Sequence, residues 1–330
     1  MFDRHSPAFR EIAARGVIRQ ADVQRLVREH LFRPIATEAE AEALLDLDAS
    51  CPVQDISWSP LLIDTIRTFI ISAVQPEGYM TAGKARWLTT RVAVDGKVGR
   101  LTCLELLIEV LETARWAPPS LAAFVLRQVE RDITTGTGPL RTAATSGKGR
   151  VAKSAVDLMR RVLAASNRGD SSAITRAEAE VLLDLHDATA MADNCLEWSE
   201  LFTKAMANVL MTASGYAAPA RAEALQPESW LDPSRGFADF LQSMTARGFA
   251  AVLEPYKQRS IEDRALAHLE HHKVEIITAE IIPEIDPVWL ALRLGNTPVL
   301  TPATRALLGY LRTQTRVLHP ALKPLLDKAA

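Results

Sequence analysis

The chain has 330 residues, of which 48% are hydrophobic and 24% are charged, and its formal net charge is -2. This length is sufficient for two domains that each bury a core of their own. Because positive and negative charges almost cancel, no overall field attracts nucleic acid or a membrane surface. We therefore expect neither as a partner.

The three cysteines, Cys51, Cys103 and Cys195, are far apart and include no C-x-x-C pair. This pattern predicts reduced thiols and no zinc or redox site. The first sixteen residues lack the apolar centre of a secretory signal, and charged residues interrupt the most apolar run, residues 61–74. We therefore expect a cytoplasmic protein that does not enter the membrane.

An internal repeat is the clearest feature of the sequence. Residues 37–47 (TEAEAEALLDL) match residues 175–185 (TRAEAEVLLDL), and Trp58-Ser59 recurs as Trp198-Ser199 at a similar spacing. Self-similarity of this kind indicates a repeated structural unit. The sequence predicts a tandem duplication of a multi-helix unit, with a helical insertion in the second copy at about residues 217–277.

A segment between the two copies has the composition of a linker. Residues 134–149 are rich in Gly, Thr and Ser and have no apolar periodicity, which is typical of a flexible connection. We therefore expect a first helical repeat domain at residues 1–133, a linker at 134–149 and a second repeat domain at 150–330.

Apolar residues recur at spacings of three and four, and no run alternates as a half-buried strand would. This pattern predicts an all-α fold. Thr-x-x-Glu capping boxes predict helix starts at Thr37, Thr102 and Thr175. Ser59-Pro60 and Thr301-Pro302 place an N-cap before a proline and predict two further starts.

An acidic row follows the capping box in each copy. Its candidate partner-binding members are Glu38, Glu42 and Asp46 in the first copy and Glu180, Asp184 and Asp187 in the second. Carboxylates one helical turn apart repel unless a cation or a basic partner lies between them. The row is either a duplicated docking site or a solvated acidic helix face, since carboxylates favour the first turn of a helix.

Two short segments carry family resemblances. Residues 167–178 resemble a degenerate EF-hand loop, with Ile174 at its eighth position and Glu178 at its twelfth. Position three is Gly169, which offers no side-chain oxygen. Both weak calcium binding and a helix-loop-helix without metal stay open.

The second resemblance is Val94-Asp95-Gly96-Lys97-Val98 and the capped segment after it. It resembles the Asp-Gly turn and downstream Glu of the TerB-like helical proteins, named after tellurite resistance. That likeness implies an all-helical fold and a weak acidic metal site formed by Asp95 and Glu105. The equivalent stretch of the second copy, residues 294–300, has no carboxylate, so a purely structural turn is the alternative.

A histidine cluster lies in the predicted insertion. On a helix, His268 and His272 face one way, and His271 and Glu275 face another, so either pair offers two ligands to a transition metal. The alternative is an exposed polar face. The sequence contains no nucleophile elbow, no complete phosphate loop and no dinucleotide fingerprint.

These observations favour a non-catalytic helical scaffold or adaptor that binds another protein through its duplicated acidic helix surfaces, without a cofactor. A module that responds to divalent cations is the first alternative. An enzyme with an unrecognised helical active site is the second. The sequence does not indicate an oligomeric state.

Overall fold

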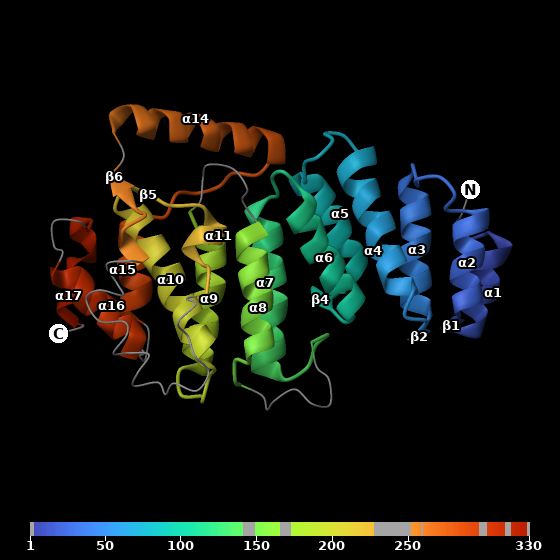
Figure 1. Ribbon diagram of the computed structural model, residues 1–330, viewed down its shortest axis with the longest axis horizontal. Coiled ribbons are helices and arrows are strands. Elements are labelled where there is room, and N and C mark those ends of the chain that lie inside the picture. The colour runs from blue at the N-terminus through green and yellow to red at the C-terminus, as the bar shows by residue number, and fades with distance from the viewer. Residues whose placement is uncertain are drawn as a thin grey trace.

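The chain folds as an elongated row of helices that lie side by side, with the two termini at opposite ends (Figure 1). Helix α14 (Ile261–Thr278) crosses over one side of this row. The predicted all-α class is confirmed in that helices dominate. The structure is a computed structural model that describes residues 3–140, 149–165, 173–227, 252–258, 260–296, 302–313 and 318–328.

The first part of the row contains seven α-helices and a π-helix within the described residues. They are α1 (Pro7–Arg15), α2 (Gln20–Glu29), α3 (Glu38–Ser50), α4 (Trp58–Thr68), the π-helix η1 (Phe69–Ala73), α5 (Ala82–Val92), α6 (Leu101–Thr113) and α7 (Pro119–Thr135). Two-residue strands lie between them: β1 (Val17–Ile18), β2 (Val53–Gln54), β3 (Ala93–Val94) and β4 (Lys97–Val98).

The second part continues the row. Its described elements are α8 (Lys153–Ala165), α9 (Arg176–Thr189), α10 (Leu196–Ala213), β5 (Tyr216–Ala217), α11 (Arg221–Ala224), β6 (Lys257–Gln258), α14, α15 (Pro287–Gly295), α16 (Pro302–Thr313), the 3-10 helix η2 (Pro320–Leu322) and α17 (Lys323–Lys328). Helix α14 lies almost entirely within the predicted insertion.

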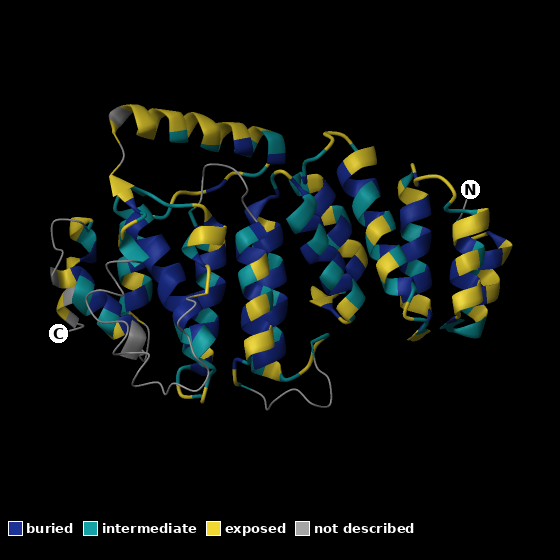
Figure 2. Ribbon diagram, in the orientation of Figure 1, coloured by how far each residue is buried: buried dark blue, intermediate teal, exposed yellow. Residues whose placement is uncertain are grey.

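Apolar side chains fill the space between neighbouring helices, and the outer sides of the helices are exposed (Figure 2). The described core is one continuous cluster that runs from Ala8 near the N-terminus to Leu325 near the C-terminus. Helix α7 packs against both α8 and α9, so the segments predicted as separate domains share that core. Among the described helices, none is long and apolar enough to cross a bilayer.

The segment predicted as a linker is anchored at both described ends. The Leu140 amide donates to the Asp132 carboxylate at 2.8 Å, and the Gly149 amide donates to the Ile133 carbonyl at 2.8 Å. Both bonds attach the connection to the end of α7. Residues 141–148 of the predicted linker lie outside the described part of the chain.

Two of the predicted capping boxes form. The Thr37 hydroxyl accepts a hydrogen bond from the Glu40 amide at 3.3 Å, and the Glu40 carboxylate accepts one from the Thr37 amide. Thr175 and Glu178 repeat both bonds at the start of α9. Each box satisfies amide groups that the first helical turn leaves without partners.

Helices begin within one residue of two other predicted starts, but the predicted N-caps there are wrong. Helix α6 begins at Leu101 after Arg100, and Thr102 instead shares a 2.8 Å hydrogen bond with Ser59 of α4. Helix α4 begins at Trp58, so Ser59 is inside it and is not its N-cap. In both cases a contact between helices takes the hydroxyl away from local capping. Thr301 lies outside the described residues, and α16 begins at Pro302.

Within the described residues, three two-residue strand pairs are present where the sequence predicts no strand. In the β3–β4 pair the turn is Asp95-Gly96, and both residues have positive φ, of 49° and 70°. Positive φ at both central positions is the geometry of a type I′ hairpin turn, for which Asp-Gly is a preferred sequence. Strands this short carry no alternating pattern that a sequence could reveal.

The repeated sequence segments have similar local contacts. The Asp55 amide donates to the Ile18 carbonyl at 2.8 Å, and the Trp58 amide donates to the Asp55 carbonyl. In the second part, the Cys195 amide donates to the Val151 carbonyl at 3.1 Å, and the Trp198 amide donates to the Cys195 carbonyl. Trp58 and Trp198 are both buried at the beginning of the helix that follows.

Candidate functional site

Helix α14 is fixed mainly near its C-terminal end. Val274 and Thr278 are buried, and the loop after the helix folds back beneath it. There the Ile282 amide donates to the Glu275 carboxylate at 2.8 Å, and the His271 Nε2 atom lies 2.8 Å from the Ile282 carbonyl oxygen. The hydrogen bond from the Ile282 amide, together with that from His272, lowers the pKa of Glu275. His271 and Glu275 therefore hold α14 on its loop.

The same segment reaches the first part of the row. The Lys273 ammonium lies 5.6 Å from the centre of the Trp116 ring, a cation–π contact. The Glu280 carboxylate accepts hydrogen bonds from the amide and the hydroxyl of Ser120, at the start of α7. The helix and its loop thus bridge the two parts of the chain.

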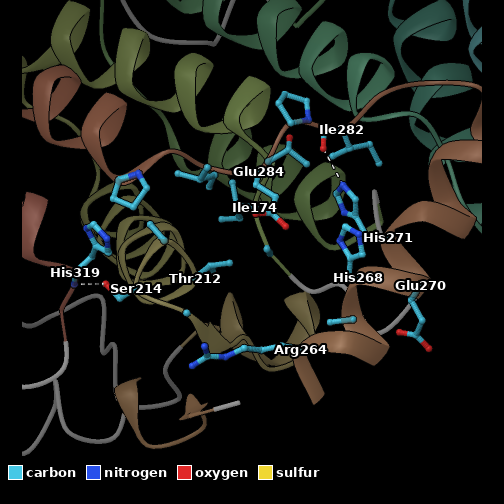
Figure 3. A pocket seen from close by; sticks show the side chains of 18 of the residues that line it. Ile174, Thr212, Ser214, Arg264, His268, Glu270, His271, Ile282, Glu284 and His319 are labelled. Carbon is cyan, nitrogen blue, oxygen red and sulfur yellow. Dashed lines mark hydrogen bonds between the residues drawn. The ribbon is translucent and has the colours of Figure 1, made fainter. Parts of the chain in front are cut away.

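Helix α14 leaves several of its large apolar side chains on the side that faces away from the row. Leu266, Leu269 and Ile276 face solvent and keep 61%, 64% and 77% of their surface exposed. Arg264 and His268 lie on the side that faces the row (Figure 3). A surface helix normally directs its apolar side inward, because burial of that surface stabilises the fold.

A cavity of about 620 Å³ lies between α14 and the row. Its roof is the polar side of α14, its floor includes the end of α10 and the start of α9, and the loop after α14 forms one wall (Figure 3). Apolar side chains and a small set of polar groups line it together. This size and this mixed lining are typical of small-molecule sites.

His319 and Ser214 form one side of the cavity (Figure 3). The His319 amide donates to the Ser214 hydroxyl at 3.0 Å, and the Nδ1 atom of His319 accepts a hydrogen bond from the Ala321 amide at 3.2 Å. Because Nδ1 accepts, a neutral ring carries its proton on Nε2. His319 can therefore donate from Nε2.

The predicted metal ligands lie in two separate places. The rings of His268 and His272 stack at 5.5 Å between centroids, while His271 and His272 both contact Glu275. Asp95 is exposed at the tip of the β3–β4 hairpin, and Glu105 lies on α6. No group of three or more potential ligands converges within the described residues.

Most carboxylates of the acidic rows form ion pairs with arginines of other helices, of the same helix or of the turn before α1. The pairs are Arg4 and Arg91 with Glu42, Arg4 with Asp46, Arg176 with Glu180, Arg127 and Arg293 with Asp184, and Arg293 with Asp187. Glu38 is exposed at the first residue of α3. The rows are thus largely neutralised within the chain.

The EF-hand-like segment lies partly outside the described residues, which omit 166–172. Within the described part, Ile174 is buried and the carboxylate of Glu178 is bound by Arg221, with nitrogen–oxygen distances of 2.8 and 2.9 Å. This ion pair is buried, and no pattern in the sequence predicted it. Arg221 lies 43 residues after Glu178, so no local pattern connects them.

A second buried charge was also missed. Lys84 donates from Nζ to main-chain carbonyls around the π-helix η1 and the turn after it, including Ile70 at 2.9 Å, Pro76 at 3.0 Å and Tyr79 at 2.8 Å. Burial lowers the pKa of Lys84 to about 8. Lys84 is the third residue of α5 and lies on the same side as the buried Ala85, Leu88 and Val92. A lysine on such an apolar side is the signal that could have indicated this contact.

Burial also explains the state of the cysteines. Cys51, Cys103 and Cys195 are all free thiols. Burial raises the pKa of Cys103 to about 12 and that of Cys195 to about 11, and it raises the pKa of Cys51 as well. Cys51 and Cys103 are buried and Cys195 is half-buried, and protonated thiols in such positions are poor nucleophiles and poor metal ligands.

Comparison of the chain with protein-family models, with curated proteins and with solved structures finds no match in any of the three. The function proposed below is therefore inferred from the geometry of the chain itself.

Proposed function

We propose that this protein is a non-catalytic helical scaffold or adaptor that binds another protein, and that the outer side of α14 is its docking surface. The observation that carries the proposal is that Leu266, Leu269 and Ile276 are all exposed on the outer side of one helix. Contiguous exposed apolar surface marks interaction sites on soluble proteins. Full burial of each such side chain contributes roughly 1.5–3 kcal/mol.

The partner element that fits this surface is an amphipathic helix. Leu266 and Ile276 are ten residues apart, so the stripe is about 15 Å long at 1.5 Å per residue. His272 and Lys273 lie between Leu269 and Ile276 on the same exposed side. A stripe of this length with apolar ends and a polar middle matches another amphipathic helix packed along it. The partner helix would pack beside α14, on the side of α14 that faces away from the row.

The acidic rows support docking less directly. A basic partner would have to displace arginines such as Arg293 and Arg127 from Asp184. Within the described residues, the α14 stripe has no covering element to displace. We therefore place the docking surface on α14 and not on the acidic rows.

Affinity purification from the native host tests the proposal. The double variant Leu266→Glu, Leu269→Glu should lose a partner that the wild-type chain retains. Ile56→Glu is the matched control, because Ile56 is 91% exposed but lies in the loop before α4. If the double variant retains every partner of the wild type, or if the stripe instead pairs two copies of this chain in sedimentation, the proposal is wrong.

We also propose that the row arose by duplication of one helical unit and that the protein works in the cytoplasm. The paired capping boxes of Thr37 and Thr175 and the matching bonds around Trp58 and Trp198 support the duplication. The three free cysteines support a reducing compartment.

A further inference from the structure

We propose that the cavity beneath α14 binds a small organic acid, with its anionic group held between Arg264 and His268 and its apolar body against the inner wall. This inference concerns the inner side of α14. It is independent of the docking role proposed for the outer side.

The first observation is a pair of solvent-exposed donors on the roof that are not paired within the described protein. Arg264 and His268 are one helical turn apart, and both line the cavity. Within the described residues, neither the Arg264 guanidinium nor a ring nitrogen of His268 has a hydrogen bond or an ion pair. An oxyanion placed between them would accept from both, and guanidinium has the fork geometry that carboxylates prefer.

The second observation is that His271 and His319 differ in whether their ring nitrogens are already engaged. His271 is occupied, because it contacts the Ile282 carbonyl and Glu275 and so holds the roof in place. His319 faces the cavity from the other side and can donate from Nε2. Donors therefore approach the cavity from two walls, as a site for an oxyanion requires.

The third observation is the apolar wall. The buried side chains of Ile174, Val274 and Ile282 and the half-buried side chain of Ile285 line the same cavity. An inorganic ion would leave the exposed part of this lining in contact with water. An organic acid with a hydrocarbon body covers it, and that burial adds to the binding energy.

Two carboxylates and a helix end also line the cavity. The Glu270 side chain points away from it, whereas Glu284 lies across the cavity from Arg264 (Figure 3). Helix α10 ends there, but the amides of Ser214 and Gly215 satisfy its last carbonyls. Glu284 can accept a hydrogen bond, so the site favours an acid that also carries a hydroxyl or an amino group.

Two fluorescent probes test this site in the full-length chain. The first is 8-anilinonaphthalene-1-sulfonate, an anion with an apolar body, and the second is N-phenyl-1-naphthylamine, which has the same body without the sulfonate. We expect saturable binding of the sulfonate. We expect Arg264→Gln and His268→Gln each to weaken it roughly 10-fold, the effect of losing one charge-assisted contact, and to leave binding of the neutral probe unchanged.

Control variants separate this proposal from the docking role. Arg86→Gln removes an exposed arginine of α5 and should not affect the sulfonate probe. Leu266→Glu with Leu269→Glu should also leave its affinity unchanged, because those side chains lie outside the cavity. Equal affinity of the wild type and Arg264→Gln, or loss of the probe in the Leu266→Glu, Leu269→Glu variant, would overturn the inference.

Discussion

At the scale of single residues, buried charges distinguish this protein from a simple helical row. Lys84 and the Glu178–Arg221 pair are each surrounded by protein, and each fastens a segment that is not helical. The Lys84 ammonium donates hydrogen bonds to main-chain carbonyls of η1 and of the turn after it. Arg221 binds Glu178 and also the Ala173 carbonyl at the start of α9. Buried charges require such partners, since desolvation is costly.

Loss of Arg221 should be strongly destabilising. Arg221→Met leaves the Glu178 carboxylate buried without its cation, and we expect the free energy of unfolding to fall by about 3–5 kcal/mol. Urea denaturation measures this change. The double variant Arg221→Met, Glu178→Gln should recover part of the loss, because it removes the buried charge. A loss below about 1 kcal/mol for Arg221→Met would contradict the role assigned to the pair.

Lys84 should make stability depend on alkaline pH. Its pKa in the folded protein, about 8, is lower than the usual 10.5, so between these values the unfolded chain binds more protons. Stability contributed by this residue therefore rises as the pH increases through that window. The free energy of unfolding of the wild type should increase relative to that of Lys84→Met between pH 8 and pH 10. Parallel pH profiles for the two proteins would refute the assignment.

At the scale of elements, the starts of α3 and α9 depend on local capping. Thr37→Ala and Thr175→Ala should each lower the free energy of unfolding by about 1 kcal/mol, because each removes the acceptor of an amide in the first turn. Urea titration of the two variants provides the measurement. Thr90→Ala, at an exposed position within α5, is the control and should not destabilise the protein. Unchanged stability in both capping variants would show that these hydroxyls are dispensable.

Helix α14 is the element whose function depends most on its orientation. Its sequence is compatible with either face against the row, because apolar and polar residues share its circumference. Anchoring by His271, Glu275 and the buried Val274 directs Arg264 and His268 inward and Leu266 outward. One orientation thus creates both the cavity and the exposed stripe.

At the scale of the whole molecule, one continuous core joins the described helices other than α14, and we expect the protein to fold without metal. Chelation with EDTA should leave the melting temperature unchanged in a thermal denaturation assay. Stoichiometric zinc tests the metal-responsive alternative, because a metal that binds the native state raises the melting temperature. A rise of several degrees that is lost in His268→Ala, His272→Ala would support that alternative and contradict the expectation.

The sequence by itself determined the features that depend on neighbours along the chain. The helical class follows from apolar spacing, and the Thr37 and Thr175 capping boxes join residues three positions apart. The Asp95-Gly96 turn belongs to the same group, because its backbone requires positive φ at two adjacent residues. Such interactions form within one turn, so a local pattern is sufficient to predict them.

Only the tertiary structure decided how distant residues meet. Thr102 has the sequence of an N-cap, yet Ser59 takes its hydroxyl from 43 positions away. Asp187 belongs to an acidic row, yet Arg293 pairs with it from 106 positions away. The cavity likewise needs the end of α10, the roof of α14 and His319 at once. These contacts form because they lower the free energy of packing between segments that are distant in sequence. The spacing of residues within one segment therefore does not reveal them.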